Sequence, residues 1–164
     1  MEDLILAAEK WAVWKHRHQF RRDGVTPYAE HPKAVRDILR DEFGVVDPEV
    51  LAAGLLHDTI EDTNTDYDEV LDRFGKRVAD LVACLTKDKR LPEARREREY
   101  FARLARAPIG AKFCKVADTL HNLRDSNAAH HLKAVSKAVR LLRTFRSARG
   151  IDRPLAILRE EASG

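Results

Sequence analysis

The sequence predicts an all-α fold in a single domain. Apolar residues recur at the three- and four-residue spacing of amphipathic helices along almost the whole chain. Only seven glycines and six prolines interrupt the 164 residues, which favours long helices over a turn-rich sandwich. The signal for β-strands is weak everywhere, and a chain of this length suits one hydrophobic core. We therefore expect a helical bundle of about eight helices.

The N-terminal region predicts two helices separated by a loop. The first should run from about Leu4 to Phe20, with Trp11 and Trp14 on its inner side. The segment 21–30 (RRDGVTPYAE) is expected to be a loop, because its glycine and proline disfavour a helix. Pro32 is suited to a first helical turn, so it predicts the start of the second helix.

The third predicted helix is the most apolar element of the chain. It starts at Asp47 and Pro48 and continues through VLAAGLLHDTIED, whose first half is apolar on every side. A helix with this pattern lies in the centre of a fold. Asp66 is a candidate cap for a fourth helix that ends near residues 74–75, and a fifth helix follows over residues 78–85.

Charged residues and then two long amphipathic stretches fill the rest of the chain. The segment 86–99 (TKDKRLPEARRERE) predicts a loop followed by a surface helix that starts at Pro92. A seventh helix is expected over residues 111–126 and an eighth over residues 132–148. A polar tail containing Pro154 should end the chain.

Composition excludes several classes of protein. The net charge of +3 comes from 30 basic and 27 acidic residues, which is less lopsided than a nucleic-acid binder usually is. Two distant cysteines, Cys84 and Cys114, make no disulfide framework. No apolar run approaches the ~18 residues of a membrane span, and the N-terminus lacks a signal-peptide pattern. We expect a cytoplasmic protein that binds neither nucleic acid nor membrane, with its oligomeric state left open.

The most informative motif is LLHDTIEDT at residues 55–63, which holds His57, Asp58, Glu61 and Asp62. These four ionisable groups end the most apolar helix, where burying a charge without a partner costs several kcal/mol. A divalent cation would compensate this cost. His57 and Asp58 are ~100° apart on a helix and could reach one ion, while Glu61 and Asp62 follow one turn later, where groups that handle water would stand. A solvated polar helix end is the alternative.

Two further motifs could contribute ligands. In KVADTLHNLRD (115–125), a helix would place Lys115, Asp118, Asn122 and Asp125 on one face, opposite an apolar side. That stripe could also be an ordinary solvent face. His31, in YAEHP, comes just before a predicted helix start, where a lone histidine is more often structural than a ligand.

Together these motifs provide a mixed nitrogen and oxygen ligand set. Such a set suits Mn²⁺, Fe²⁺ or Mg²⁺ better than structural zinc, which prefers cysteine. Open positions on the ion would hold water, whose lowered pKa makes hydroxide available near neutral pH. We predict one divalent ion, bound by His31, His57, Asp58 and Asp118.

In order and spacing, these motifs resemble the HD superfamily. The resemblance is closer to the hydrolase domain of RelA/SpoT-type enzymes, and closest to the small stand-alone alarmone hydrolases typified by the metazoan SpoT homolog. It covers roughly the first three quarters of the chain. The matching segments are HRHQFRRDGVTPYAEHP (16–32), LAAGLLHDTIEDTNT (51–65), FGKRVADLVACLT (74–86), DKRLP (88–92) and GAKFCKVADTLHNLRD (110–125).

The resemblance implies one HD domain over residues 1–164 that hydrolyses the 3′-pyrophosphate of guanosine tetra- or pentaphosphate, usually with Mn²⁺. GDP or GTP and pyrophosphate would be the products. By position, Glu61 and Asp62 match the catalytic acidic pair that activates or positions water. Arg21 matches the arginine that stacks on the purine, Arg22 a neighbouring basic contact, and Asn122 a nucleoside contact.

The 3′-diphosphate also needs cations, for which Lys87, Lys89 and Lys115 are further candidates, although each could equally be a solvated charge. The chain departs from the family at Glu93, where such small hydrolases commonly carry lysine. It also diverges from about residue 128, where basic residues such as Lys133 and Arg140 could replace the family's tyrosine and arginine.

Two other functions stay open at this point. A related phosphatase could act on the 2′-phosphate of NADPH or on ordinary nucleotides, because the predicted metal site acts on phosphorus and not on the base. A nucleotide-binding module without catalysis is less favoured, because a pure binder has no use for Glu61 and Asp62 near an anionic ligand.

Overall fold

Helices account for all the regular structure in the computed structural model, which describes residues 2–164. The all-α prediction is confirmed, because these residues form no β-strand and only an isolated bridge between Phe20 and Pro27. The helices are α1 (Glu2–Lys15), α2 (Glu30–Asp37) with a π-helical turn η1 (Ile38–Glu42), α3 (Pro48–Leu56), α4 (Thr59–Asp62), α5 (Tyr67–Phe74), α6 (Lys76–Leu85), α7 (Glu93–Arg106), α8 (Ile109–Arg124), α9 (Ala128–Thr144) and α10 (Asp152–Ser163).

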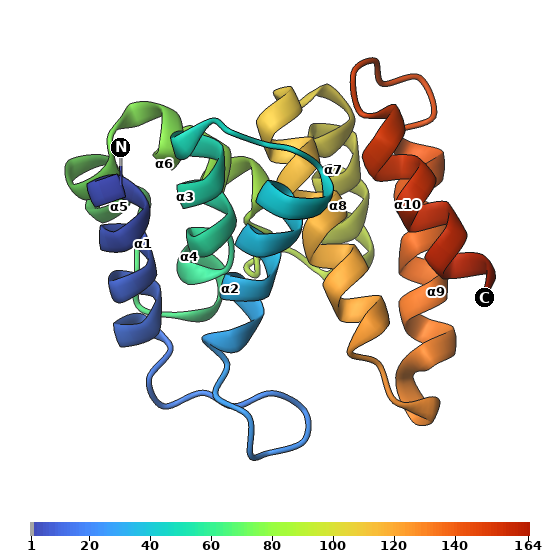
Figure 1. The fold of residues 1–164 in the computed structure, drawn as a ribbon, viewed down its shortest axis with the longest axis horizontal. Helices are drawn as coiled ribbons and strands as arrows, with labels where there is room; N and C mark the ends of the chain where they lie inside the picture. Colours follow the sequence, from blue (N-terminus) through green and yellow to red (C-terminus); the bar gives the residue numbers. More distant parts are fainter. Residues whose placement is uncertain (1) are drawn as a thin grey trace.

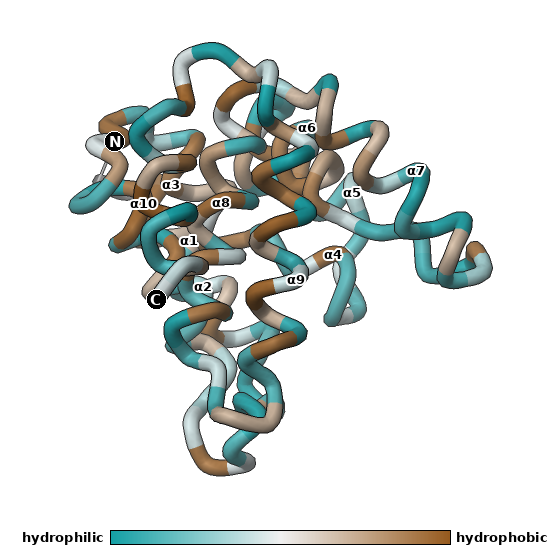
Figure 2. The backbone as a smooth tube through the Cα atoms, turned by 90° about the vertical axis from the view of Figure 1, so that its right-hand side faces the viewer, coloured by the Kyte–Doolittle hydropathy of each residue, from teal (hydrophilic) through white to brown (hydrophobic). Residues whose placement is uncertain are grey.

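The apolar helix α3 lies in the centre of the bundle, as predicted. It packs against α1, α2, α6 and α8 (Figure 1), and all its residues from Val50 to Leu56 are buried. Asp47 caps its start by accepting a hydrogen bond from the Glu49 N–H at 3.0 Å. Hydrophobic residues gather in this central part, whereas α7 on the outside is largely hydrophilic (Figure 2).

The third predicted helix is not continuous, and this corrects the prediction. It ends at Leu56, and the short α4 resumes at Thr59 after a turn at His57 and Asp58. Two side chains form hydrogen bonds to backbone carbonyl groups at the end of α3. His57 Nδ1 donates to the Gly54 carbonyl at 2.8 Å, and Thr59 Oγ1 donates to the Leu56 carbonyl at 2.7 Å. Such local bonds compete with helix continuation.

The ends of other helices also differ from the prediction. The first helix stops at Lys15 instead of Phe20, and Trp14 is 51% exposed rather than on the inner side. The predicted polar tail is the helix α10, which buries Leu155 and Leu158 against α8 and α9. None of the helices in the described residues has the length and apolar composition that a membrane span requires.

Candidate metal and catalytic site

Three of the four predicted ligands meet at one point. His31 at the start of α2, His57 at the end of α3 and Asp118 in the middle of α8 each offer a ligand atom within 4.8 Å of the others, and all three are buried. His31 Nε2 lies 3.2 Å from both His57 Nε2 and Asp118 Oδ1. Helices from three separate segments therefore converge on this cluster.

The fourth predicted ligand, Asp58, lies beside the cluster. Its Oδ2 is 2.9 Å from His57 Nε2 and 3.7 Å from His31 Nε2. Tyr28 donates its hydroxyl hydrogen to the same oxygen. Asp58 thus contacts both histidines, but it is not one of the three residues, His31, His57 and Asp118, whose ligand atoms all lie within 4.8 Å of one another.

The donor set fits a divalent cation. Because His57 Nδ1 donates to the Gly54 carbonyl, Nε2 is the ring nitrogen that faces His31 and Asp118 and that would bind a metal ion. Burial alone would lower the pKa of His57, but the carboxylates of Asp58 and Asp118 outweigh burial and raise that pKa well above its usual value. Carboxylates that favour a proton on His57 would favour a metal ion at the same place.

Asp118 is held in place by neighbours on its own helix. Lys115 Nζ donates to Asp118 Oδ2 at 2.7 Å and Asn122 Nδ2 donates to Oδ1 at 2.6 Å. The stripe continues to Arg21, whose NH2 lies 3.1 Å from Asn122 Oδ1 and 2.6 Å from Asp125 Oδ2. Asp118 is only 7% exposed and Lys115 and Asn122 are half-buried, so the stripe is not an ordinary solvent face, although Asp125 at its end is exposed.

The predicted catalytic pair lies on α4, and both residues line the cavity of about 310 Å³ that contains the histidines. Glu61 Oε1 accepts the Lys87 backbone N–H at 2.7 Å. Burial raises the pKa of Glu61 above its usual value despite this bond. Asp62 Oδ1 lies 2.7 Å from Lys89 Nζ, which leaves the pair with one carboxylate suited to take a proton and one held by a cation.

The predicted substrate contacts are only partly brought together. Arg21, Arg22 and Asn122 line the same cavity. Lys89 lies outside its lining, because its ammonium group bonds to Asp62 and to the Glu61 carbonyl. Arg21 is fixed by Asp125 and is not a free loop arginine.

Several residues of the site were not predicted. Tyr28 donates to Asp58, and its place in the YAEHP motif, three residues before His31, was the sequence signal that could have pointed to it. His121, one turn after Asp118, places its Nδ1 2.7 Å from His31 Nδ1. Burial first, and then the nearby His31, lower the pKa of His121 to about 4, so it stays neutral beside the cluster.

Comparison with known proteins identifies the family. A family model described as an HD domain matches residues 8–146. The guanosine-3′,5′-bis(diphosphate) 3′-pyrophosphohydrolase MESH1 of Mus musculus is 48% identical over 124 residues, which are 75% of this chain and 69% of that protein. The enzyme of the same activity name from Aquifex aeolicus is 38% identical over 123 residues, 73% of this chain but 17% of its own length.

Solved structures agree with this result. A metazoan ortholog of SpoT, described as hydrolysing ppGpp, superposes with a TM-score of 0.85 at 31% identity, over 96% of this chain and 93% of that one. A protein from Listeria monocytogenes superposes with a TM-score of 0.68 at 28% identity, over 84% of this chain and 92% of that one. The chain is therefore a member of the HD-domain family and a relative of the MESH1 hydrolases.

Proposed function

We propose that this chain is a metal-dependent phosphohydrolase that removes the 3′-diphosphate of guanosine tetra- and pentaphosphate. The products are pyrophosphate and GDP or GTP. One observation supports the proposal most: a buried His31, His57 and Asp118 cluster shares a cavity with Glu61 and Asp62. Its relatives carry the name of this reaction.

The cluster would hold the ion, with Asp58 as the adjacent fourth ligand. Its nitrogen and oxygen donors suit Mn²⁺, with Fe²⁺ and Mg²⁺ as alternatives. When bound, the ion would polarise a phosphoryl oxygen and lower the pKa of a coordinated water. Lys115 and Asn122 hold the Asp118 carboxylate in its orientation.

Glu61, whose pKa is raised, would take up the proton of the attacking water, and Asp62 would help to position that water. The water oxygen forms a bond to the phosphorus next to the 3′-oxygen, the bond between that phosphorus and the 3′-oxygen breaks, and the 3′-oxygen leaves with a proton. Arg21 would stack on the purine, because Asp125 and Asn122 already fix its guanidinium plane at the cavity wall. Asn122 would contact the nucleoside.

A substrate panel tests the proposal. Purified protein with Mn²⁺ is incubated with ppGpp, NADPH and GMP, and the products are identified by mass spectrometry. We expect GDP and pyrophosphate from ppGpp at the highest kcat/KM. Preferential release of phosphate from NADPH would instead assign the related phosphatase activity, and no turnover of any compound would contradict the enzyme assignment.

A further inference from the structure

The helix that carries Glu61 and Asp62 is too short to be stable by itself. α4 has four residues, Thr59–Asp62, so it is a single helical turn. Isolated helices shorter than about 12–15 residues are marginal in water. The carbonyl groups of a last helical turn also have no partner within their own helix. The orientation of Glu61 and Asp62 therefore depends on contacts that other segments make with α4.

Gln19, in the loop between α1 and α2, makes one of these contacts. Its Nε2 donates to the Asp62 carbonyl at 2.7 Å, and its Oε1 lies 2.7 Å from His16 Nδ1. Because an amide oxygen only accepts hydrogen bonds, His16 Nδ1 donates, and one orientation of the Gln19 amide satisfies both contacts. His16 is 1% exposed, so a buried side chain fixes the amide that supports the end of α4.

The backbone of Gln19 connects it to the start of α4 as well. Its carbonyl accepts the Tyr28 N–H at 2.9 Å, and the Tyr28 hydroxyl donates to Asp58. Asp58 is the residue that immediately precedes α4. The loop between α1 and α2 therefore contacts both ends of α4, through Tyr28 at the start and Gln19 at the end.

Lys89, in the segment between α6 and α7, supports the same end of α4. Its Nζ donates to the Glu61 carbonyl at 2.8 Å and to Asp62 Oδ1 at 2.7 Å. One ammonium group thus bonds to a backbone carbonyl and to a side chain of the predicted catalytic pair. With Gln19, two separate segments satisfy the last two carbonyl groups of α4.

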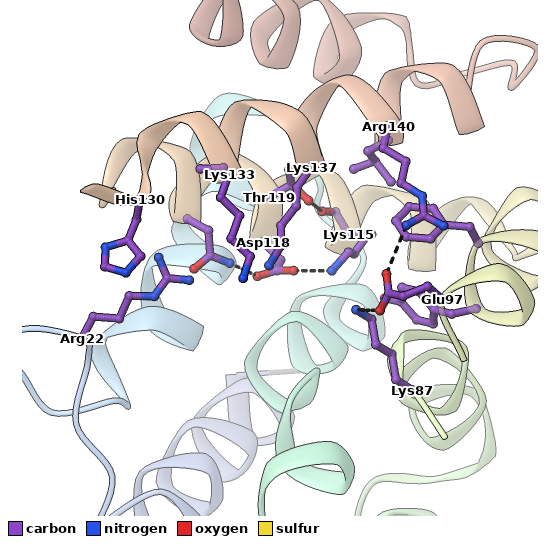
Figure 3. Close-up of a pocket in the computed structure, with 15 residues that line it drawn as sticks. Arg22, Lys87, Glu97, Lys115, Asp118, Thr119, His130, Lys133, Lys137 and Arg140 are labelled. Carbon is purple, nitrogen blue, oxygen red and sulfur yellow. Dashed lines mark hydrogen bonds and ion pairs between the residues drawn. The ribbon is translucent and has the colours of Figure 1, made fainter. Parts of the chain in front are cut away.

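Lys87, two residues earlier, holds Glu61 through its backbone. Its N–H donates to Glu61 Oε1 at 2.7 Å. Its side chain extends into a neighbouring cavity of about 120 Å³, which Lys137 also lines, and its Nζ lies there 2.5 Å from Glu97 Oε1 (Figure 3). The contact of Lys87 with Glu61 therefore needs no particular side chain, whereas the contacts of Gln19 and Lys89 with α4 do.

We propose that Gln19 and Lys89 are positioning residues, which stabilise α4 and thereby hold Glu61 and Asp62 in the orientation that catalysis requires. The inference rests on the proposed function, in which this pair handles the attacking water. Neither Gln19 nor Lys89 lines the metal-cluster cavity. Both residues therefore act through α4, and Lys89 has this role in place of the substrate contact expected from the sequence.

Three variants and one control test the proposal. Gln19→Met and Lys89→Met remove the polar end of each side chain and keep nearly the same length. Lys89→Arg keeps a positive charge and several donors. Lys76→Met is the matched control, because it removes an exposed lysine–aspartate ion pair, with Asp80 at 2.6 Å, that lies within α6.

The first measurement is hydrogen–deuterium exchange of the peptide 57–66 with saturating Mn²⁺, which reports how often α4 opens. Gln19→Met should speed this exchange roughly 2- to 10-fold, because a neutral hydrogen bond is lost. Lys89→Met should speed it by roughly 2- to 5-fold, because an ion pair of an exposed lysine contributes less. Exchange in α3 should not change, and Lys76→Met should match the wild-type protein. An unchanged rate in either methionine variant would overturn the role of that residue.

The second measurement is steady-state kinetics on ppGpp at Mn²⁺ concentrations that saturate each variant. Both methionine variants should lower kcat by roughly 5- to 100-fold with KM within about twofold, because misplacing a reacting group by about 1 Å can cost about 100-fold in rate. Lys89→Arg should keep kcat within about threefold of the wild-type value, because its guanidinium can donate to the same two oxygens. A rise in KM at constant kcat in Lys89→Met would make Lys89 a substrate contact and overturn its positioning role. An unchanged kcat despite faster exchange would overturn the link to catalysis.

The two measurements separate this proposal from the proposed function, because the exchange rate does not depend on the reaction. Faster exchange in both methionine variants of a protein whose wild type does not hydrolyse ppGpp would keep the support of α4 and reject the function. Unchanged exchange and normal ppGpp hydrolysis in both variants would reject the positioning roles and keep the function.

Discussion

The hydroxyl of Tyr28 should control metal affinity through Asp58. It donates to Asp58 Oδ2, the oxygen that lies 2.9 Å from His57 Nε2. Tyr28→Phe removes this bond and keeps the ring, which contacts His31 with ring centroids 5.7 Å apart. A hydrogen bond to a charged group contributes about 1.5–3 kcal/mol, or roughly 10- to 150-fold in Kd. Loss of a residue that orients a ligand typically costs about 10- to 100-fold in metal affinity, so we expect Kd for Mn²⁺ to rise by 10- to 100-fold.

Titration calorimetry with Mn²⁺ measures this change, and Tyr67→Phe is its matched control. Tyr67 donates to Asp80 Oδ1 at 2.7 Å, a bond of the same kind between α5 and α6, outside the metal-cluster cavity. The control should keep the wild-type Kd. Equal losses in both variants, or an unchanged Kd in Tyr28→Phe, would refute the reasoning that Asp58 is a ligand oriented by Tyr28.

Four further outcomes are expected. Chelation should abolish turnover and lower the Tm, because an ion at 100 times its Kd adds about 2.7 kcal/mol of stability; full activity in chelator with no retained metal would contradict this. Asp62→Asn should keep the metal, measured by elemental analysis, but lower kcat by about 10²- to 10⁴-fold; loss of the ion would make Asp62 a ligand instead. Arg21→Ala should raise KM for ppGpp roughly 2- to 30-fold with little change in kcat, since stacking on a base contributes ~0.5–2 kcal/mol; a collapse of kcat at constant KM would place Arg21 at the reacting phosphates. Burial raises the pKa of Glu61, so kcat at saturating metal should fall with decreasing pH, with a midpoint above the usual pKa of glutamate. If Glu61→Gln showed the same fall in kcat at low pH, the role of Glu61 as a base would be contradicted.

Much of the grouping of residues at the candidate site could be predicted because these residues are concentrated in short segments. His57, Asp58, Glu61 and Asp62 are within one six-residue stretch, and imidazole and carboxylate groups are common ligands of divalent metal ions. The meeting of His31 with Asp118, 87 residues later in the chain, was predicted by combining the three motifs into one ligand set and agreed with the resemblance to the HD superfamily, but it could not be read from local spacing. Local pattern alone left His31 as a structural histidine.

Other features depend on contacts that no local pattern contains. The break after Leu56 arises because His57 bonds to a carbonyl of its own helix. Pro154 suggested a tail, yet in the first turn of α10 a proline costs no hydrogen bond. The cavity lined by Lys137 depends on how α9 packs against α8, so sequence could offer Lys133 and Arg140 as candidates without placing them.

Hydrolysis of ppGpp in ¹⁸O-labelled water tests the central claim most directly. The metal-loaded protein is incubated with ppGpp, and mass spectrometry locates the label in the products. We predict one ¹⁸O atom in pyrophosphate, none in GDP, and no products when His57→Ala removes a central ligand. Release of orthophosphate, label in the 3′-hydroxyl of GDP, or full turnover by His57→Ala would contradict a 3′-pyrophosphohydrolase built on this cluster.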